Sequence, residues 1–116
     1  IIEKFHGWTK DNSDKLVVSL DEVLAIVSLY WHTESITSSA RFYYENGPLG
    51  FTFNSVSQPM AGAIFENEIA RPPRVWAEKI YNIVQWNQYP GGHFAALESP
   101  KILAEDIFSF VAKLEI

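Results

Sequence analysis

The amino-acid sequence predicts an α/β fold in which parallel strands alternate with helices. Residues 51–116 read as strand, loop, helix, strand, loop, helix, which is the order typical of a parallel sheet. The composition is that of a globular protein, because 47% of the residues are apolar and 15% are aromatic. With 116 residues, the chain is long enough for at most one domain.

Two helices are expected in the first half. Ser19 and Glu22 form the capping-box pattern that starts a helix, and apolar residues then recur at helical spacing: Leu20, Val23, Leu24, Val27, Tyr30 and Trp31. A second helix is expected through SITSSARFYYEN, residues 35–46, with Gly47 and Pro48 ending it. Its Thr and Ser residues lower helix propensity, so tertiary contacts have to stabilise it.

Two strands are expected in the second half. FTFNSVSQPMAGAIF, residues 51–65, predicts a strand that leads into a loop, because Pro59 and Gly62 interrupt it. YNIVQW, residues 81–86, is a compact run of residues that favour strands.

A helix is expected after each strand. Pro72 and Pro73 suit the first turn of a short helix that carries Val75, Trp76 and Ile80. Ser99 and Pro100 form an N-cap and first-turn pair for the last helix. That helix has the clearest helical spacing in the chain, in Leu103, Ile107, Phe110, Val111 and Leu114.

The charge and residue usage exclude several classes of function. Nine basic residues are scattered among fourteen acidic ones, with a net charge of −5, so nucleic-acid binding is not expected. The absence of cysteine excludes disulfides and thiolate zinc sites. No apolar run approaches the roughly 18 residues of a membrane span. The first residues, IIEKFHGW, do not resemble a signal peptide, and we expect the chain to start in mid-structure.

Two loops follow the predicted strands and carry chemically active side chains. Residues 65–68 contain two glutamates, and residues 91–94 contain His93 after two glycines. If the strands are neighbours, an acid and an imidazole meet at one sheet edge, as a hydrolytic base and its orienting carboxylate require. Gly91 and Gly92 are expected to take positive φ and hold His93 at that edge. On pattern alone, a lone histidine is more often a surface or capping residue, so both interpretations stay open.

The stretch GGHFAALESPKILAEDIFSFV, residues 91–111, resembles the C-terminal signature of epoxide hydrolases of the α/β-hydrolase fold. FENEIARPPRVW, residues 65–76, resembles the family segment that carries the catalytic acid. IIEKFHGW, SLDEVLAIVSLYW and ITSSARFYYEN resemble the end of the lid in the microsomal-type branch. The resemblance therefore implies the C-terminal portion of an α/β-hydrolase fold. Residues 1–50 would end the helical lid or cap, and residues 51–116 would form the last two parallel strands and their helices.

The resemblance also implies a mechanism and its residues. An aspartate opens the epoxide to form an ester, tyrosine hydroxyls stabilise the alkoxide, and a histidine–acid pair activates water to release a diol. It assigns His93 as base, Glu68 as acid and Tyr43 as hydrogen-bond donor to the epoxide oxygen. Glu66 is the competing acid, because the histidine loop is slightly shorter than in many relatives. Tyr44 would point about 100° away from Tyr43 on a helix. No metal or organic cofactor is implied, and the expected substrates are a small apolar epoxide and water.

The sequence departs from the family pattern in lacking the nucleophile. Its aspartates lie in a polar stretch before a helix or inside the last one, and none sits on a strand-to-helix turn: Asp11, Asp14, Asp21 and Asp106. The oxyanion segment and the partner lid tyrosine are also missing. We therefore expect the isolated chain to be inactive, with the remainder of the hydrolase supplied by an unrecorded segment or a companion chain.

The heavy aromatic content fits the same expectation. Trp8, Trp31, Phe42 and Phe51 are expected to pack against the missing part, or against a second copy through the open sheet edge. A cytoplasmic location is expected, with any membrane anchor confined to the missing N-terminal part. Two alternatives stay open, a related hydrolase such as a haloalkane dehalogenase and a non-catalytic interaction module. For Glu68 the alternative is a surface ion pair with Arg71 or Arg74.

Overall fold

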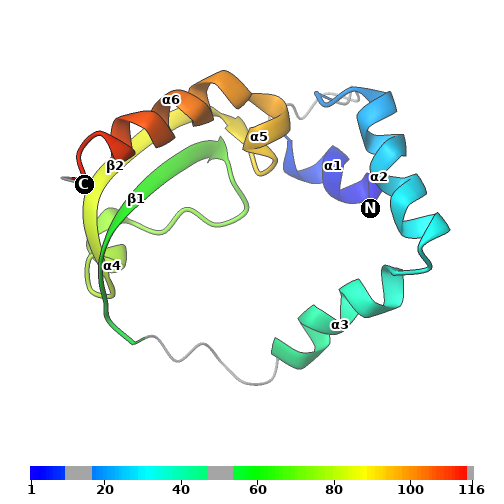
Figure 1. Cartoon of the computed structure of the whole chain (residues 1–116), viewed down its shortest axis with the longest axis horizontal. Coiled ribbons are helices and arrows are strands. Elements are labelled where there is room, and N and C mark those ends of the chain that lie inside the picture. The colour runs from blue at the N-terminus through cyan, green and yellow to red at the C-terminus, as the bar shows by residue number, and fades with distance from the viewer. Residues whose placement is uncertain (10–16, 47–53, 115–116) are drawn as a thin grey trace.

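The computed structural model describes residues 1–9, 17–46 and 54–114, which form helices followed by a β-α-β-α unit (Figure 1). The elements are α1 (Ile2–Trp8), α2 (Leu20–His32), α3 (Ile36–Asn46), β1 (Val56–Asn67), α4 (Arg74–Ala77), β2 (Tyr81–Gly92), α5 (Ala95–Glu98) and α6 (Pro100–Val111). The predicted α/β class is confirmed. Helices α1 and α5 were not predicted, because a single turn or two carries too little periodicity to be read from sequence.

The two strands pair in parallel, and α6 runs along one face of the sheet (Figure 1). In the register of the pair, Phe65 lies opposite Tyr89 and Asn67 lies opposite Gly92. Both strands therefore end at the same level of the sheet. The residues that follow them in sequence are brought to one edge, as the sequence predicted.

The predicted break of the first strand at Pro59 and Gly62 is wrong, since β1 runs through both residues from Val56 to Asn67. Pro59 lies at a register shift, where a missing N–H is tolerated. At Gly62 an added Cβ would lie 2.5 Å from the Trp86 ring, so glycine lets the indole of β2 cross the strand. Residues 51–53 of the predicted strand lie outside the described residues.

The helix ends agree in part with the predicted caps. The Ser19 hydroxyl accepts from the Glu22 backbone N–H at 3.2 Å, and the Glu22 carboxylate accepts from the Ser19 N–H at 3.2 Å, which confirms the capping box. α6 begins at Pro100 as predicted, but the side chain of Ser99 makes no capping hydrogen bond.

The predicted bounds of α4 are wrong, and the predicted end of α3 is not tested. α4 begins after both prolines rather than with them, and it ends before Ile80. Gly47 and Pro48, the predicted end of α3, lie outside the described residues.

A polar seam joins β2 to α6. Asp106 is 4% exposed, and its carboxylate accepts hydrogen bonds from Gln85 (2.9 Å), Asn87 (2.6 Å) and Tyr89 (2.6 Å). These three donors occupy alternate strand positions, so they share one face of β2. Among the apolar residues of the last helix, Ile107 is 50% exposed and Val111 is 46% exposed.

The seam gives the stability a defined dependence on pH. Burial would raise the pKa of Asp106, but hydrogen bonds from Tyr89, Asn87 and Gln85 and the charge of Lys113 outweigh burial and lower the pKa below its ordinary value. The unfolded chain therefore binds this proton more tightly than the folded one. Stability from Asp106 is complete above the unfolded pKa of about 3.9 and is lost as the pH falls through the lower folded pKa.

Replacing Asp106 by asparagine is expected to lower the free energy of unfolding by about 1.5–3 kcal/mol at pH 7. The amide carries no charge, and its NH2 group would face side chains that donate hydrogen bonds to Asp106. The difference should shrink as the pH falls below about 4. Urea unfolding at pH 7 and pH 3 measures both effects. Glu105→Gln, one residue away and exposed, is the matched control. A loss in Asp106→Asn that is the same at both pH values would contradict the assignment.

The apolar core is small and lies where α1 and α2 meet the segment after β2. Phe5, Val18 and Val23 form a buried cluster, with Ile26 and Phe94 packed against it. The radius of gyration is 16.7 Å, against about 13 Å for a compact domain of this length. The accessible surface is 8945 Å², against about 6,400 Å² for a compact protein of this mass. The described chain is therefore more open than a self-contained domain.

The exposed apolar side chains lie mainly on the helices. Trp31 is 79% exposed and Phe42 is 68% exposed, whereas Trp8 is partly buried and Phe51 lies outside the described residues. Within the described ranges the longest helix is α2, with 13 residues, and none there is long and apolar enough to cross a bilayer.

Candidate active site

The carboxyl ends of β1 and β2 place two active side chains next to each other. Asn67 lies opposite Gly92 in the sheet, and Glu68 and His93 are the next residues in each segment. The register shifts between Phe65 and Asn67, and an irregularity of this kind redirects the side chains that follow it. The site therefore arises where the pairing of the two strands stops.

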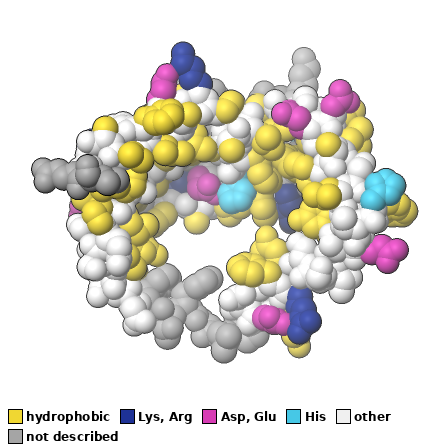
Figure 2. Space-filling view, viewed as in Figure 1, with side chains coloured by type: hydrophobic (Ala, Val, Ile, Leu, Met, Phe, Trp, Pro, Cys, Tyr) yellow, Lys and Arg dark blue, Asp and Glu magenta, His cyan; other side chains and the backbone are white. Residues whose placement is uncertain are grey.

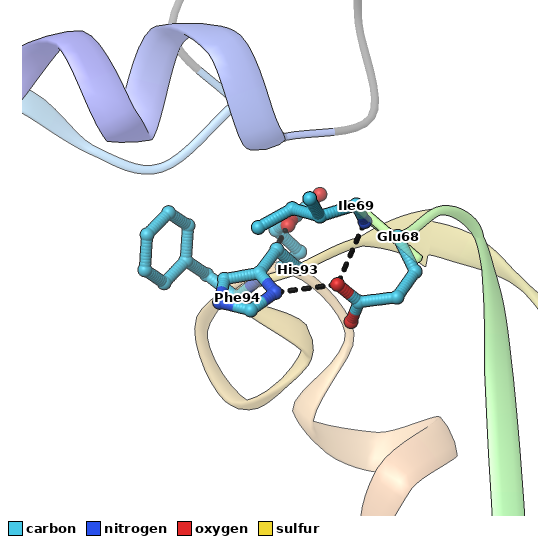
Figure 3. A network of polar contacts seen from close by, with 5 residues as sticks. Glu68, Ile69, His93 and Phe94 are labelled. Atoms are coloured by element: carbon cyan, nitrogen blue, oxygen red, sulfur yellow. Dashed lines mark hydrogen bonds and ion pairs between the residues drawn. The ribbon is translucent and has the colours of Figure 1, made fainter. Parts of the chain in front are cut away.

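Glu68 and His93 are joined by a short hydrogen bond. Nδ1 of His93 lies 2.6 Å from Oε1 of Glu68 (Figure 3). The same oxygen accepts from the backbone N–H of Ile69 at 2.7 Å, which holds the carboxylate in place. The His93 and Glu68 side chains are 36% and 29% exposed, so the pair is partly shielded from water.

The hydrogen bond determines which nitrogen of His93 can act as a base. An ionised carboxylate only accepts hydrogen bonds, so the neutral imidazole carries its proton on Nδ1. Nε2 is then the acceptor nitrogen. A base of this kind, oriented by a carboxylate on its other nitrogen, is the arrangement that hydrolases use to activate water or a nucleophile.

Glu66 lies elsewhere. It lines a separate cavity of about 270 Å³ together with Arg71, Arg74 and Trp86. Arg74 pairs with Glu78 at 2.7 Å, whereas Glu68 bonds to the imidazole. The structure thus brings Glu68 to His93 and places Glu66 away from it.

The two glycines predicted to lie in the loop before His93 are instead the last two residues of β2, and they are needed for different reasons. Gly91 has a backbone φ of 136°, which residues other than glycine rarely adopt. Gly92, expected to do the same, has no positive φ. It is needed for space, because an added Cβ would lie 2.5 Å from the Trp8 carbonyl oxygen. The backbone N–H of His93 donates to that oxygen at 2.8 Å.

Tyr43 and His93 line the same cavity, which has a volume of about 750 Å³. Figure 2 shows hydrophobic side chains and a histidine beside the central opening of this face. Most of its lining is apolar or aromatic, and it comes from α1, α2, α3 and the segment after β2: Ile1, Lys4, Phe5, Trp8, Ile26, Tyr30, Ile36, Ser39, Ala40, Tyr43, His93, Phe94 and Leu97. Tyr44 is 81% exposed and is not among the lining residues.

Neither aspartate in the described ranges lines this cavity. Asp21 is exposed in the first turn of α2, and Asp106 is engaged in the polar seam. Asp11 and Asp14 lie outside the described residues. In the same part of the chain, no group of three or more His, Asp or Glu side chains converges to hold a metal ion.

Sequence reasoning did not find the aromatic residues around His93. The Trp8 ring lies 5.1 Å from the His93 ring, and Phe94 stacks on Phe5 at 4.3 Å between ring centroids. These contacts join segments that are far apart in the sequence. No local signal reveals them, although the pair of glycines before His93 hints at a close approach of backbone.

Comparisons with known proteins agree with these features. No family model matches the chain. It is 41% identical to a "Putative epoxide hydrolase" of Stigmatella aurantiaca over 92% of the chain and 25% of that protein. It is 39% identical to "Epoxide hydrolase 1" of Sus scrofa over 99% of the chain and 28% of that protein. It is 40% identical to "Juvenile hormone epoxide hydrolase 1" of Ctenocephalides felis over the same 99% and 28%.

A solved structure gives the same result in three dimensions. The structure of the Aspergillus niger epoxide hydrolase superposes with a TM-score of 0.80 at 31% identity, over 97% of this chain and 28% of that one. The chain therefore spans about a quarter of the length of the proteins it matches.

Proposed function

Because the chain belongs to the epoxide hydrolase family of the α/β-hydrolase fold and corresponds to its C-terminal part, we propose that it supplies the water-activating half of an enzyme that converts epoxides to diols. The observation that carries the proposal is the 2.6 Å hydrogen bond between Glu68 and His93 at the paired ends of β1 and β2. In this proposal residues 1–50 end the lid, and residues 51–116 close the hydrolase core.

His93 acts in the second half of the reaction. An aspartate in the remainder of the enzyme opens the epoxide and becomes an ester of the future diol. A water oxygen then bonds to the ester carbonyl carbon while Nε2 of His93 takes the water proton. The bond to the diol oxygen breaks and the imidazolium returns its proton to that oxygen. The second water proton leaves the new carboxyl group and neutralises the alkoxide formed at ring opening, which completes the diol and regenerates the aspartate. Glu68 stabilises the positive imidazolium and keeps the ring oriented.

Tyr43 acts in the first half of the reaction. Its hydroxyl would donate a hydrogen bond to the epoxide oxygen as the ring opens and negative charge develops. Its place in the cavity that His93 also lines supports this role. The largely apolar lining supports a small apolar epoxide as substrate.

Replacing Tyr43 by phenylalanine in the complete enzyme is expected to slow ester formation by about 10²-fold, the usual cost of one lost donor to a developing oxyanion. The decay of the ester should be unchanged. Rapid-quench kinetics with styrene oxide separates the two steps. Tyr44→Phe is the matched control and should leave both rates unaltered, because Tyr44 does not line the cavity. A larger loss in Tyr44→Phe than in Tyr43→Phe would overturn this role.

The nucleophile and the cover for the exposed apolar helices are proposed to come from the remainder of the hydrolase, in the same polypeptide or in a companion chain. A surface about 40% larger than that of a compact protein of this mass supports this. The isolated 116-residue chain is then expected to be inactive.

The test compares native and denatured masses of the protein as it is expressed, followed by an assay for diol formation from styrene oxide. We expect this chain within a larger polypeptide or assembly, and diol formation by that species alone. A complete protein that binds styrene oxide without forming a diol would overturn the proposed reaction. Turnover by the isolated chain would overturn the assignment of the nucleophile to the missing part.

A further inference from the structure

We propose that Trp8 is a positioning residue for the His93 base, through which the end of α1 holds the histidine loop and limits the rotation of the imidazole. The inference rests on the proposed function, in which His93 acts only in ester hydrolysis. It gives the α1 segment a role beyond lining the cavity.

The first support is a backbone contact between distant segments. The His93 N–H donates to the Trp8 carbonyl at 2.8 Å. Trp8 is the last residue of α1, where carbonyls have no partner within the helix. The histidine loop therefore satisfies an open acceptor of α1, and each segment fixes the other.

The second support is the close approach that Gly92 allows. A Cβ at this position would lie 2.5 Å from the Trp8 oxygen and 2.9 Å from the Thr9 carbonyl carbon. Both atoms belong to the backbone, so they cannot move aside as a flexible side chain would. Because Gly92 has no positive φ, what the position requires is space rather than an unusual conformation.

The third support is the ring contact. The indole of Trp8 and the imidazole of His93 lie 5.1 Å apart at 77°, an edge-to-face arrangement. Trp8 is also stacked with Phe94, with ring centroids 6.3 Å apart, and Lys4 Nζ lies 5.1 Å from its ring. The hydrogen bond that Nδ1 of His93 donates to Glu68 fixes the direction of this nitrogen but leaves the ring free to turn about that bond. The perpendicular indole restricts this remaining rotation.

The orientation of the imidazole matters because a general base must reach the proton it removes. Productive distances between heavy atoms are about 2.6–3.2 Å, and a displacement of about 1 Å can cost 10²-fold in rate. Loss of the Trp8 ring should therefore slow decay of the ester, which needs His93. Formation of the ester does not need His93, so at saturating epoxide it should change much less than decay, even though Trp8 lines the cavity.

The experiment measures both steps in the complete enzyme, with styrene oxide and mass analysis of the quenched protein. In Trp8→Leu, measured at saturating styrene oxide because Trp8 also lines the cavity, we expect decay of the ester to slow by about 10- to 100-fold, with a much smaller change in the rate of formation. Trp8→Phe keeps an aromatic ring and should recover most of the decay rate. Trp76→Leu, which removes an indole on α4 away from the cavity, is the matched control and should alter neither rate.

Gly92→Ala tests the backbone contact independently, since its methyl group forces the loop away from Trp8. It should also slow decay selectively. Folding of each variant is checked by circular dichroism; if Trp8→Leu does not fold, Trp8→Phe and Gly92→Ala decide the matter. Unchanged decay in the folded variants, or equal losses in both steps, would overturn the positioning role. A wild-type enzyme that forms neither ester nor diol would instead refute the proposed function.

Discussion

Replacing His93 by alanine in the complete enzyme is expected to stop the reaction after one equivalent of epoxide. The ester should still form, because the aspartate attacks without help from the imidazole, but water would lack its base. Steady-state turnover should fall by about 10³-fold, and the quenched protein should gain the mass of one epoxide molecule.

The matched control for this variant is His32→Ala, at the exposed C-terminal end of α2. It should turn over as the wild type does and accumulate no ester. Repeated turnover by His93→Ala at the wild-type rate would remove His93 from the mechanism, and so would loss of turnover without any ester.

Replacing Glu68 by glutamine is expected to produce the second-largest loss. The amide has nearly the same shape but no negative charge, so it neither stabilises the imidazolium nor holds the proton on Nδ1. Decay of the ester should slow by about 10²- to 10³-fold, and its formation should be nearly unaffected. Single-turnover kinetics at pH 7 measures both rates.

Glu66 provides the control for this prediction, because it lies two residues away in the same segment and lines a different cavity. Glu66→Gln should leave decay of the ester within about twofold of the wild type, as surface substitutions usually do. If Glu66→Gln slows the decay and Glu68→Gln does not, the acid of the pair is Glu66.

Short-range signals predicted the local structure well. The Ser19–Glu22 capping box and the start of α6 at Pro100 were both readable, because each involves residues within one helical turn. The break predicted at Pro59 and Gly62 was wrong because the prediction considered only the residues of β1 and not its pairing with another strand. The partner β2 stabilises β1 through this region, and the Trp86 ring covers Gly62.

The sequence predicted that an acid and an imidazole would form the candidate site, but it did not settle which glutamate contacts His93. An acidic loop and a glycine–histidine loop, each after a strand, indicated that an acid and an imidazole would meet. Which acid contacts His93 depends on where β1 stops pairing with β2, because Glu66 lies within β1 whereas Glu68 is the first residue after it. That information is held in the pairing of two strands rather than in either one.

The sequence by itself determined the α/β order of elements, the chemical groups after each strand and the family to which they belong. Only the tertiary structure decided that Glu68 rather than Glu66 bonds to His93, that Asp106 joins β2 to α6, and that Trp8 contacts the histidine loop. The physical reason is the distance along the sequence between the residues that interact. Periodicity and caps act within a few residues, whereas strand register, close approach at Gly92 and buried hydrogen bonds depend on segments that meet only when the chain folds.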